Sequence, residues 1–363
     1  MQYRITTNPG LEDLCAREID ARLRSEGLSG EIREQPFGLA GNLMLAIEAP
    51  EGNSVFPSRV GAILHSLKIA FHVVKHLQMV ELPVPVDLSA VLSAVSVVDF
   101  PDCGSDHSFR VSSSRTGAHD FTSLDIERET GAVVQRNTGM SVDLEHFDRH
   151  IRVDLVHSTL LVGIQTTARG LDKRYTWVYK PRVSLKTVVA QAMLQLGSDS
   201  LDNIQHILDP FCGSGTILLE AAHTFPDARI QGFDLFEAAV DGASLNIAHA
   251  GLSDRVRVTQ ADARELRKQL PRGSVDMIVT NPPFGVRLGP RTDFKRLYHQ
   301  FLSGAAYVLK PGGRLVFLGG RRRHHVVHIL KEVRSLSLKH VRVIETGGIY
   351  PAVYVMTRLP DRH

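Results

Sequence analysis

Residues 207–222 read Ile-Leu-Asp-Pro-Phe-Cys-Gly-Ser-Gly-Thr-Ile-Leu-Leu-Glu-Ala-Ala, and this stretch decides the fold. The mainly apolar residues 205–208 have the length of a short strand, and residues 216–222 are good helix formers with an apolar face. Between them, Gly213 and Gly215 allow a sharp turn and a close approach by a ligand. A strand that turns through glycine into a helix predicts a binding site at the carboxyl edge of a parallel sheet.

The glycine turn departs from two common phosphate-binding loops. A dinucleotide loop of the form G-x-G-x-x-G requires a third glycine at the position of Leu218. A P-loop requires a lysine before its Ser or Thr, and this turn has no lysine. The turn therefore fits a ligand that carries no phosphate.

A second motif lies about seventy residues later, where Asn281-Pro282-Pro283-Phe284 follows the apolar strand pattern of residues 277–280. Together, residues 209–216 and 281–284 resemble the two signature motifs of S-adenosylmethionine-dependent methyltransferases that modify exocyclic amines of nucleobases. The alternative is a Rossmann-like domain that binds another ligand. The resemblance implies S-adenosylmethionine as cofactor and a class I methyltransferase domain.

From residue 204 the sequence alternates strand and helix patterns, which predicts a doubly wound, mostly parallel sheet. The first, second and fourth predicted strands end at Asp209, Asp234 and Asn281. The third is followed by Asp262, and the fifth covers residues 314–318. Residues 341–345 and 352–357 fit the closing antiparallel hairpin of this methyltransferase class. The candidate functional residues thus follow the carboxyl ends of strands, where such sheets bind ligands.

The resemblance assigns cofactor contacts along this edge. Asp234 would accept the ribose hydroxyls, Asp262 the adenine amino group, and Asp209 the ammonium group of the amino acid tail. Backbone N–H groups of the glycine turn would hold the tail carboxylate. For Asp234 and Asp262 the alternative is a helix cap. The full set of expected cofactor contacts is Ser184, Lys186, Asp209, Phe211, Cys212, Gly213, Ser214, Gly215, Thr216, Asp234, Leu235, Asp262, Ala263 and Asn281.

The catalytic residues that the resemblance implies are Asn281, Pro282, Pro283 and Phe284. The Asn281 side-chain oxygen and the Pro282 carbonyl would accept the two N–H bonds of an exocyclic amine and direct its lone pair at the methyl group. The two prolines preorganise the loop, and Phe284 would stack on the base. We expect direct methyl transfer without a metal or a covalent intermediate. Cys212 is interpreted as a small packing residue, with a nucleophilic cysteine as the alternative.

The N-terminal half reads as α+β. Strands are expected at residues 3–7, 41–48, 108–112, 151–156 and 159–166, and helices at 11–25, 88–98 and 124–137. Residues 58–80 read as one or two helices. The order after residue 106 resembles a THUMP domain, which grips the acceptor end of tRNA. We therefore divide the chain into a ferredoxin-like unit (1–65), a THUMP domain (66–170), a linker (171–183) and the Rossmann-like methyltransferase domain (184–363).

Basic residues supply candidate RNA contacts. In the linker, residues 173–182 interleave basic and aromatic side chains, which could clamp phosphate and stack a base, or form a solvated linker packed on a neighbouring domain. Arg321, Arg322 and Arg323 form a charge run that could meet the RNA backbone, and the alternative is a solvated face. The candidate RNA-binding residues are Arg110, Arg115, Lys173, Arg174, Arg287, Arg291, Arg321, Arg322 and Arg323.

Composition sets broader limits. The 363 residues carry a net charge of +3 and only three cysteines, which are far apart, so neither a disulfide framework nor a zinc site is expected. No apolar run approaches the roughly twenty residues of a membrane span, and the first residues do not form a signal peptide. We expect a cytoplasmic monomer that has no membrane partner.

Two further stretches, residues 284–289 and 345–351, indicate the substrate class. They resemble the corresponding stretches of the tRNA guanine-N2 methyltransferases that modify position 6 in the acceptor stem. Phe284 stands where tyrosine is frequent in that family, so stacking is retained but a hydroxyl contact is lost. Three alternatives stay open: a 23S rRNA guanine-N2 methyltransferase, an RNA or DNA adenine-N6 methyltransferase, and a non-catalytic RNA-binding protein.

Overall fold

The structure, a computed structural model, describes residues 1–50, 55–181, 184–199, 201–283, 293–320, 328–330 and 332–361. The chain divides into two compact units. The first unit comprises Met1–Thr7 and Cys15–Leu171, and the second comprises Asn8–Leu14 and Asp172–His363.

The first unit is built on a nine-stranded sheet with the order β2-β3-β1-β4-β9-β8-β5-β7, in which β6 pairs with β8. Its strands are β1 (Gln2–Thr6), β2 (Glu31–Glu34), β3 (Asn42–Ala46), β4 (His72–Glu81), β5 (Ser108–Ser112), β6 (Arg115–Thr116), β7 (Ser141–Val142), β8 (Arg149–Val156) and β9 (Thr159–Gln165). The helices are α1 (Glu12–Ser25), whose first residues cluster with the second unit, α2 (Phe56–His65), α3 (Leu88–Ser96) and α4 (Ser123–Thr138).

The expected helix over residues 58–80 is wrong beyond His65. Helix α2 ends there, and β4 follows as a strand that pairs antiparallel with both β1 and β9. Pairing with one strand on each side outweighs the helical pattern that residues 66–80 show in the sequence alone. Strands from both sides of residue 65 belong to this one sheet. The domain boundary predicted at residue 65 therefore stays a prediction. Strand β2 was not predicted.

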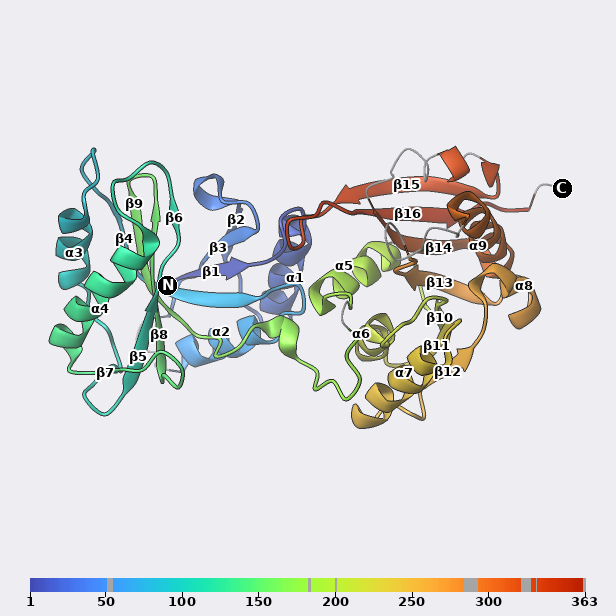
Figure 1. Ribbon diagram of the computed structural model, residues 1–363, viewed down its shortest axis with the longest axis horizontal. Coiled ribbons are helices and arrows are strands. Elements are labelled where there is room, and N and C mark those ends of the chain that lie inside the picture. The colour runs from blue at the N-terminus through green and yellow to red at the C-terminus, as the bar shows by residue number, and fades with distance from the viewer. Residues whose placement is uncertain are drawn as a thin grey trace. The chain divides into compact units, whose positions relative to one another are not determined.

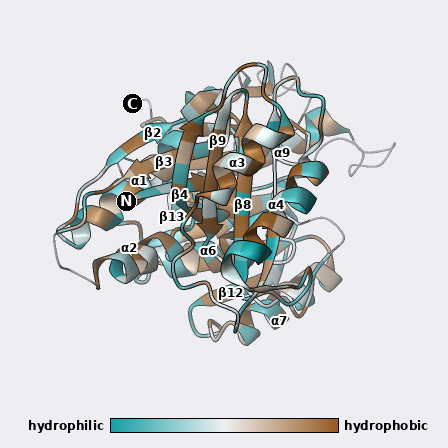
Figure 2. Cartoon of the chain, turned by 90° about the vertical axis from the view of Figure 1, so that its left-hand side faces the viewer, coloured by the Kyte–Doolittle hydropathy of each residue, from teal (hydrophilic) through white to brown (hydrophobic). Residues whose placement is uncertain are grey.

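One face of this sheet is covered by helices. Helix α4 begins with a capping box between Thr122 and Asp125 and ends at Gly139, whose φ of 75° is left-handed. It buries Ile126 and Val134 in a core with strands β5, β8 and β9. Figure 2 shows hydrophobic colour along β4, β8 and β9, with α3 and α4 lying over them.

The second unit confirms the predicted α/β architecture. Its seven-stranded sheet has the order β12-β11-β10-β13-β14-β16-β15, in which the first five strands are parallel and β16 and β15 form the antiparallel closing pair. The strands are β10 (His206–Asp209), β11 (Arg229–Asp234), β12 (Val256–Gln260), β13 (Val275–Thr280), β14 (Leu309–Gly319), β15 (Leu336–Val343) and β16 (Ala352–Arg358).

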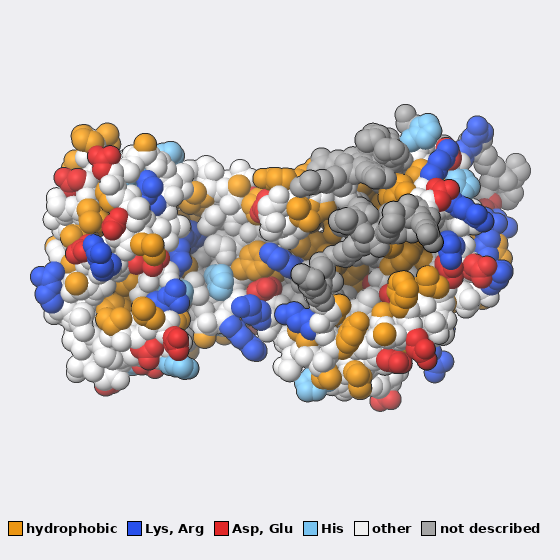
Figure 3. All heavy atoms as spheres, viewed as in Figure 1, with side chains coloured by type: hydrophobic (Ala, Val, Ile, Leu, Met, Phe, Trp, Pro, Cys, Tyr) orange, Lys and Arg blue, Asp and Glu red, His pale blue; other side chains and the backbone are white. Residues whose placement is uncertain are grey.

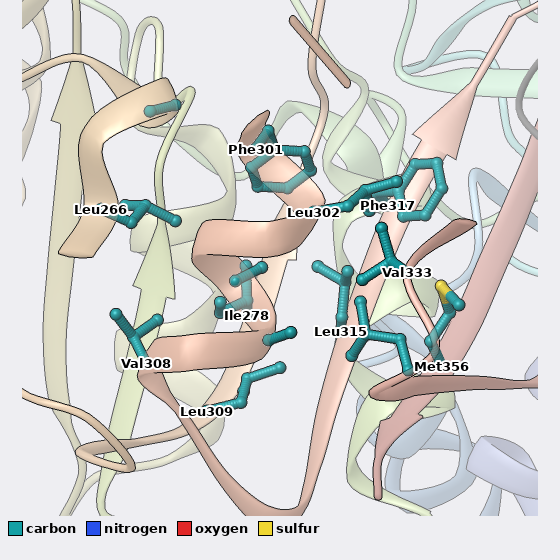
Figure 4. Close-up of a cluster of buried hydrophobic side chains, with 14 of the residues drawn as sticks. Leu266, Ile278, Phe301, Leu302, Val308, Leu309, Leu315, Phe317, Val333 and Met356 are labelled. Atoms are coloured by element: carbon teal, nitrogen blue, oxygen red, sulfur yellow. The ribbon is translucent and has the colours of Figure 1, made fainter. Parts of the chain in front are cut away.

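Helices cover both faces of this sheet, as Figure 1 shows. One face carries α5 (Thr187–Ser198), α6 (Thr216–Thr224) and α7 (Glu237–His249), and the other carries α8 (Leu266–Gln269) and α9 (Phe294–Val308). Helix α9 places Phe301 and Leu302 against the strand residues Leu315 and Phe317 (Figure 4). This core holds the parallel strands in register, so that their carboxyl ends meet at one edge.

Candidate active site

The glycine turn joins β10 to α6 as predicted. Gly213 and Gly215 have φ values of 51° and 85°, a left-handed region that favours glycine, and Gly215 is the N-cap of α6. A Cβ on Gly213 would meet no atom within 4 Å. The turn is therefore open for a ligand to approach the backbone at this position.

Asp234 lies beside this turn at the end of β11. One carboxylate oxygen accepts the Gly213 N–H at 2.9 Å, and the other accepts the Phe236 N–H at 3.1 Å. The carboxylate thus holds the turn and also binds the backbone of Phe236, the residue before α7. Leu235 follows on the surface, with 48% of its area exposed.

Asp209 is buried, with 1% of its area exposed, and one oxygen of its carboxyl group accepts two hydrogen bonds. The Thr280 hydroxyl donates at 2.6 Å and the Phe211 N–H donates at 3.1 Å. The pKa of Asp209 is raised to about 7, mainly by burial and to a smaller extent by the charge of Asp234, and the two donors only partly offset this rise. Thr280, which directly precedes Asn281 and was not predicted as a site residue, links the end of β13 to the end of β10.

The Asn281 side-chain oxygen is buried and has no hydrogen-bond partner among the described residues. Buried polar atoms in native proteins are nearly always paired, so this acceptor requires an explanation, and a ligand donor supplies one. Asn281 borders a cavity of about 100 Å³ beside the glycine turn. The cavity is lined by Pro181, Ser184, Leu185, Asp209, Phe211, Cys212, Gly213, Ser214, Thr216, Ile217 and Asn281.

The structure therefore brings together eight of the predicted cofactor residues around one cavity, with Gly215 within the same turn. Pro181, Leu185 and Ile217 line it as well and were not predicted. Among the described residues, Lys186, Asp234, Leu235, Asp262 and Ala263 lie outside the lining.

Asp262 follows β12, as predicted, but its carboxylate is engaged locally. It accepts the Arg264 backbone N–H at 2.9 Å and forms an ion pair with the Arg264 guanidinium, which lowers the pKa of Asp262. This is the capping role that was the alternative for this residue. The Ala263 side chain is buried.

Helix α5 starts at Thr187, and Lys186 is its cap residue, with no side-chain cap bond. Ser184 lines the cavity. Lys186 is exposed.

Cys212 has 6% of its area exposed, and burial raises the pKa of its thiol well above its ordinary value. A neutral, buried thiol is a poor nucleophile, which supports the packing interpretation. Within the described part of the chain, no group of three or more His, Cys, Asp and Glu side chains could hold a metal ion.

The residues predicted to contact RNA differ in the partners that the structure gives them. Arg174 is ion-paired at 2.8 Å with Glu220, a fully buried residue of α6, so this guanidinium holds the linker on its own unit. Arg110 and Arg115 donate to the carbonyls of Leu144 (3.3 Å) and Gly117 (2.8 Å). Lys173 is exposed. The predicted residues Phe284, Arg287, Arg291, Arg321, Arg322 and Arg323 lie outside the described residues.

Surface charge by itself does not locate an RNA site. On the face shown in Figure 3, Lys and Arg side chains are interspersed with Asp and Glu. None of the helices in the described ranges combines the length and apolar character needed to cross a membrane.

Two known protein families match the chain, one in each unit. Residues 174–350 match the family model of the RMKL-like methyltransferase domain, and residues 87–165 match the THUMP domain. A tRNA (guanine(6)-N2)-methyltransferase of Thermus thermophilus is 36% identical, covering 99% of this chain and 100% of the relative. One of Archaeoglobus fulgidus is 30% identical, covering 98% and 92%.

Among solved structures, TrmN from Thermus thermophilus superposes with a TM-score of 0.80 at 34% identity, and the match covers 99% of each chain. The THUMP match falls within the first unit, and the methyltransferase match falls within the second. The chain therefore belongs to the THUMP-domain-containing, S-adenosylmethionine-dependent RNA guanine-N2 methyltransferases, of the tRNA (guanine(6)-N2)-methyltransferase type.

Proposed function

We propose that this chain methylates N2 of guanine at position 6 in the acceptor stem of tRNA. The substrate and position follow the names of the Thermus and Archaeoglobus relatives, which match over nearly their full lengths. The THUMP domain at residues 87–165 supplies a second argument for RNA. We expect the protein to act in the cytoplasm as a monomer.

The residues around the glycine turn fit the cofactor. S-adenosylmethionine supplies an electrophilic methyl group. Backbone N–H groups of residues 213–216 would hold its carboxylate, and Asp209 its ammonium group. Asp234 would accept the ribose hydroxyls. Asp262 would contact adenine only after its carboxylate exchanges the Arg264 partner, or through an oxygen that keeps spare acceptor capacity.

The observation that carries the proposal is the buried, unpartnered oxygen of Asn281 at the edge of the cavity. An exocyclic amine is a poor nucleophile because its lone pair is conjugated with the base. The Asn281 oxygen and the Pro282 carbonyl would accept its two N–H bonds, so that the nitrogen is held with its lone pair toward the methyl group. Pro282 is buried, and its ring restricts the backbone. Most of the rate would come from this positioning.

The RNA would be held mainly outside this pocket. We propose that the THUMP domain binds the 3′ end and acceptor stem, with Arg110, Arg115 and Lys173 among its contacts. The two arginines would have to exchange or share their carbonyl partners. Arg174 is withdrawn as an RNA contact because it neutralises buried Glu220.

The test compares two tRNA transcripts that differ only at position 6, guanine or adenine, in methyl-transfer assays followed by nucleoside analysis. We expect N2-methylguanosine from the first transcript and no product from the second. Product from both transcripts would mean that the methylated guanine lies at a position other than 6. N6-methyladenosine refutes the base assignment, and activity confined to a 23S rRNA fragment refutes tRNA. Gln269→Ala, which removes an exposed amide of α8, is the control for Asn281→Ala.

A further inference from the structure

The linker is bound to its own catalytic unit by one asparagine of α7. The Asn246 side-chain oxygen accepts the N–H groups of Val178 (3.0 Å) and Tyr179 (2.9 Å), and its amide donates to the Tyr179 carbonyl at 2.8 Å. Asn246 is 1% exposed. A buried side chain that makes three bonds to two consecutive backbone residues fixes that part of the linker.

The same amide reaches the glycine turn. It donates its second N–H to the Ser214 carbonyl at 3.0 Å, so both of its N–H groups are used. The Gly215 N–H, which belongs to the same planar peptide, donates to the Cys212 carbonyl at 2.8 Å. Both ends of the Ser214–Gly215 peptide are therefore tied, and Asn246 holds one of them.

Helix α7 is also shaped to receive the linker. Gly242 lies one turn before Asn246, and a Cβ on Gly242 would come within 2.2 Å of the Tyr179 ring. Glycine at this position makes room for the ring. Nearby, Arg174 pairs with Glu220 of α6, so the linker is docked at two points.

Docking determines where the linker meets the cavity. Pro181 lies two residues after the docked Tyr179 and lines the same cavity as Ser214. We propose that Asn246 is a positioning residue that couples docking of the linker to binding of the cofactor. Release of the linker would break three of the four Asn246 side-chain bonds, so that the amide no longer holds the Ser214 carbonyl in a fixed position, and it would move Pro181 in the wall of the cavity. The inference rests on the proposed cofactor site.

The chain provides its own reporter for this coupling, because Trp177 is its only tryptophan and lies in the docked linker. Its ring packs edge-on against Tyr175, with the centroids 5.8 Å apart, and Tyr175 in turn packs against His223 of α6, with the centroids 5.6 Å apart. Emission of Trp177 therefore reports linker docking, and calorimetric titration with S-adenosylmethionine reports cofactor affinity. By reciprocity, the cofactor should shift the emission of the wild-type protein toward the docked form.

The informative variants are Asn246→Ala and Gly242→Ala, and Ser244→Ala on the exposed side of α7 is the control. Asn246→Ala removes the bonds to both the linker and the turn, whereas Gly242→Ala displaces only the Tyr179 ring. We expect red-shifted emission and about tenfold weaker cofactor binding in both, because each variant displaces the docked linker and so loses the coupling between docking and cofactor binding. Ser244→Ala should match the wild type.

Red-shifted emission with wild-type affinity in both variants would overturn the coupling. If Asn246→Ala shows no folded transition by circular dichroism, Gly242→Ala and Tyr179→Ala decide the question by the same readouts. A wild-type protein that fails to bind the cofactor refutes the proposed cofactor site instead. Wild-type binding with unaffected variants refutes only the coupling.

Discussion

Lowering the pH should weaken cofactor binding through Asp209. Burial raises the pKa of this carboxyl group to about 7, from an ordinary value of 3.8. Its proposed partner is the ammonium group of the cofactor, which requires the ionised carboxylate. A proton on Asp209 therefore competes with the cofactor, and binding of the cofactor should lower the pKa of the carboxyl group.

The size of the effect follows from the fraction of ionised carboxylate. With a pKa of about 7, about a tenth of the free protein is ionised at pH 6 and about three quarters at pH 7.5. If only the ionised form binds, the apparent Kd rises about eightfold from pH 7.5 to pH 6. Titration calorimetry at both pH values measures this ratio directly.

Asp209→Asn is the matched control, because an amide oxygen can still accept from Thr280 and from the Phe211 N–H. This variant should bind the cofactor more weakly, with no pH dependence in this range. A wild-type Kd that changes less than about twofold would refute the reasoning. An Asp209→Asn variant that keeps the full pH dependence would assign it to another group.

The raised pKa of Asp209 also makes the stability of the fold depend on pH. The neutral form of Asp209 is favoured by folding, so between about pH 4 and pH 7 the folded state binds more protons than the unfolded state. The contribution of this group to the free energy of unfolding is therefore greatest below pH 4, falls as the pH rises, and levels off above pH 7. Asp209→Asn should flatten that part of the stability profile.

Three further substitutions test the site and its supports. Thr280→Val removes a donor to Asp209 and should move the midpoint of cofactor binding to higher pH, as measured by titration; an unchanged midpoint would show that the hydroxyl does not stabilise the carboxylate. Gly232→Ala places a Cβ 2.5 Å from a leucine methyl of α6 and should lower the free energy of urea unfolding by about 1–3 kcal/mol, whereas full stability would mean that the turn relaxes freely. Arg174→Ala leaves the carboxylate of Glu220 buried without its cation and should cost about 3 kcal/mol, whereas replacing both residues by leucine should recover stability.

Much of the catalytic fold could be predicted because its signals are local. Strand and helix periodicities, the glycine turn and the positions of Asp209, Asp234 and Asn281 at strand ends are all visible within short windows of sequence. The parallel order of the sheet then brings these ends together. Proximity between Asp209 and Asn281 thus follows from topology and needs no long-range information.

The supports of the site could not be predicted, because each is a contact between residues far apart in the chain. Arg174 reads as an exposed basic residue until Glu220 is placed beside it. Thr280 reads as the end of a strand, and Asn246 as an ordinary helix residue. Strand β4 was missed for the same reason, since pairing on both sides makes it a strand.

The most direct test of the account is the rate of methyl transfer by Asn281→Ala to a tRNA carrying guanine at position 6, measured in single turnovers at saturating cofactor. We predict a loss of about 10²–10³-fold, the range for removing one preorganised polar contact, while Gln269→Ala keeps the wild-type rate. A folded Asn281→Ala protein that transfers methyl groups at the wild-type rate would contradict the assignment of the buried oxygen as the acceptor for the base amine.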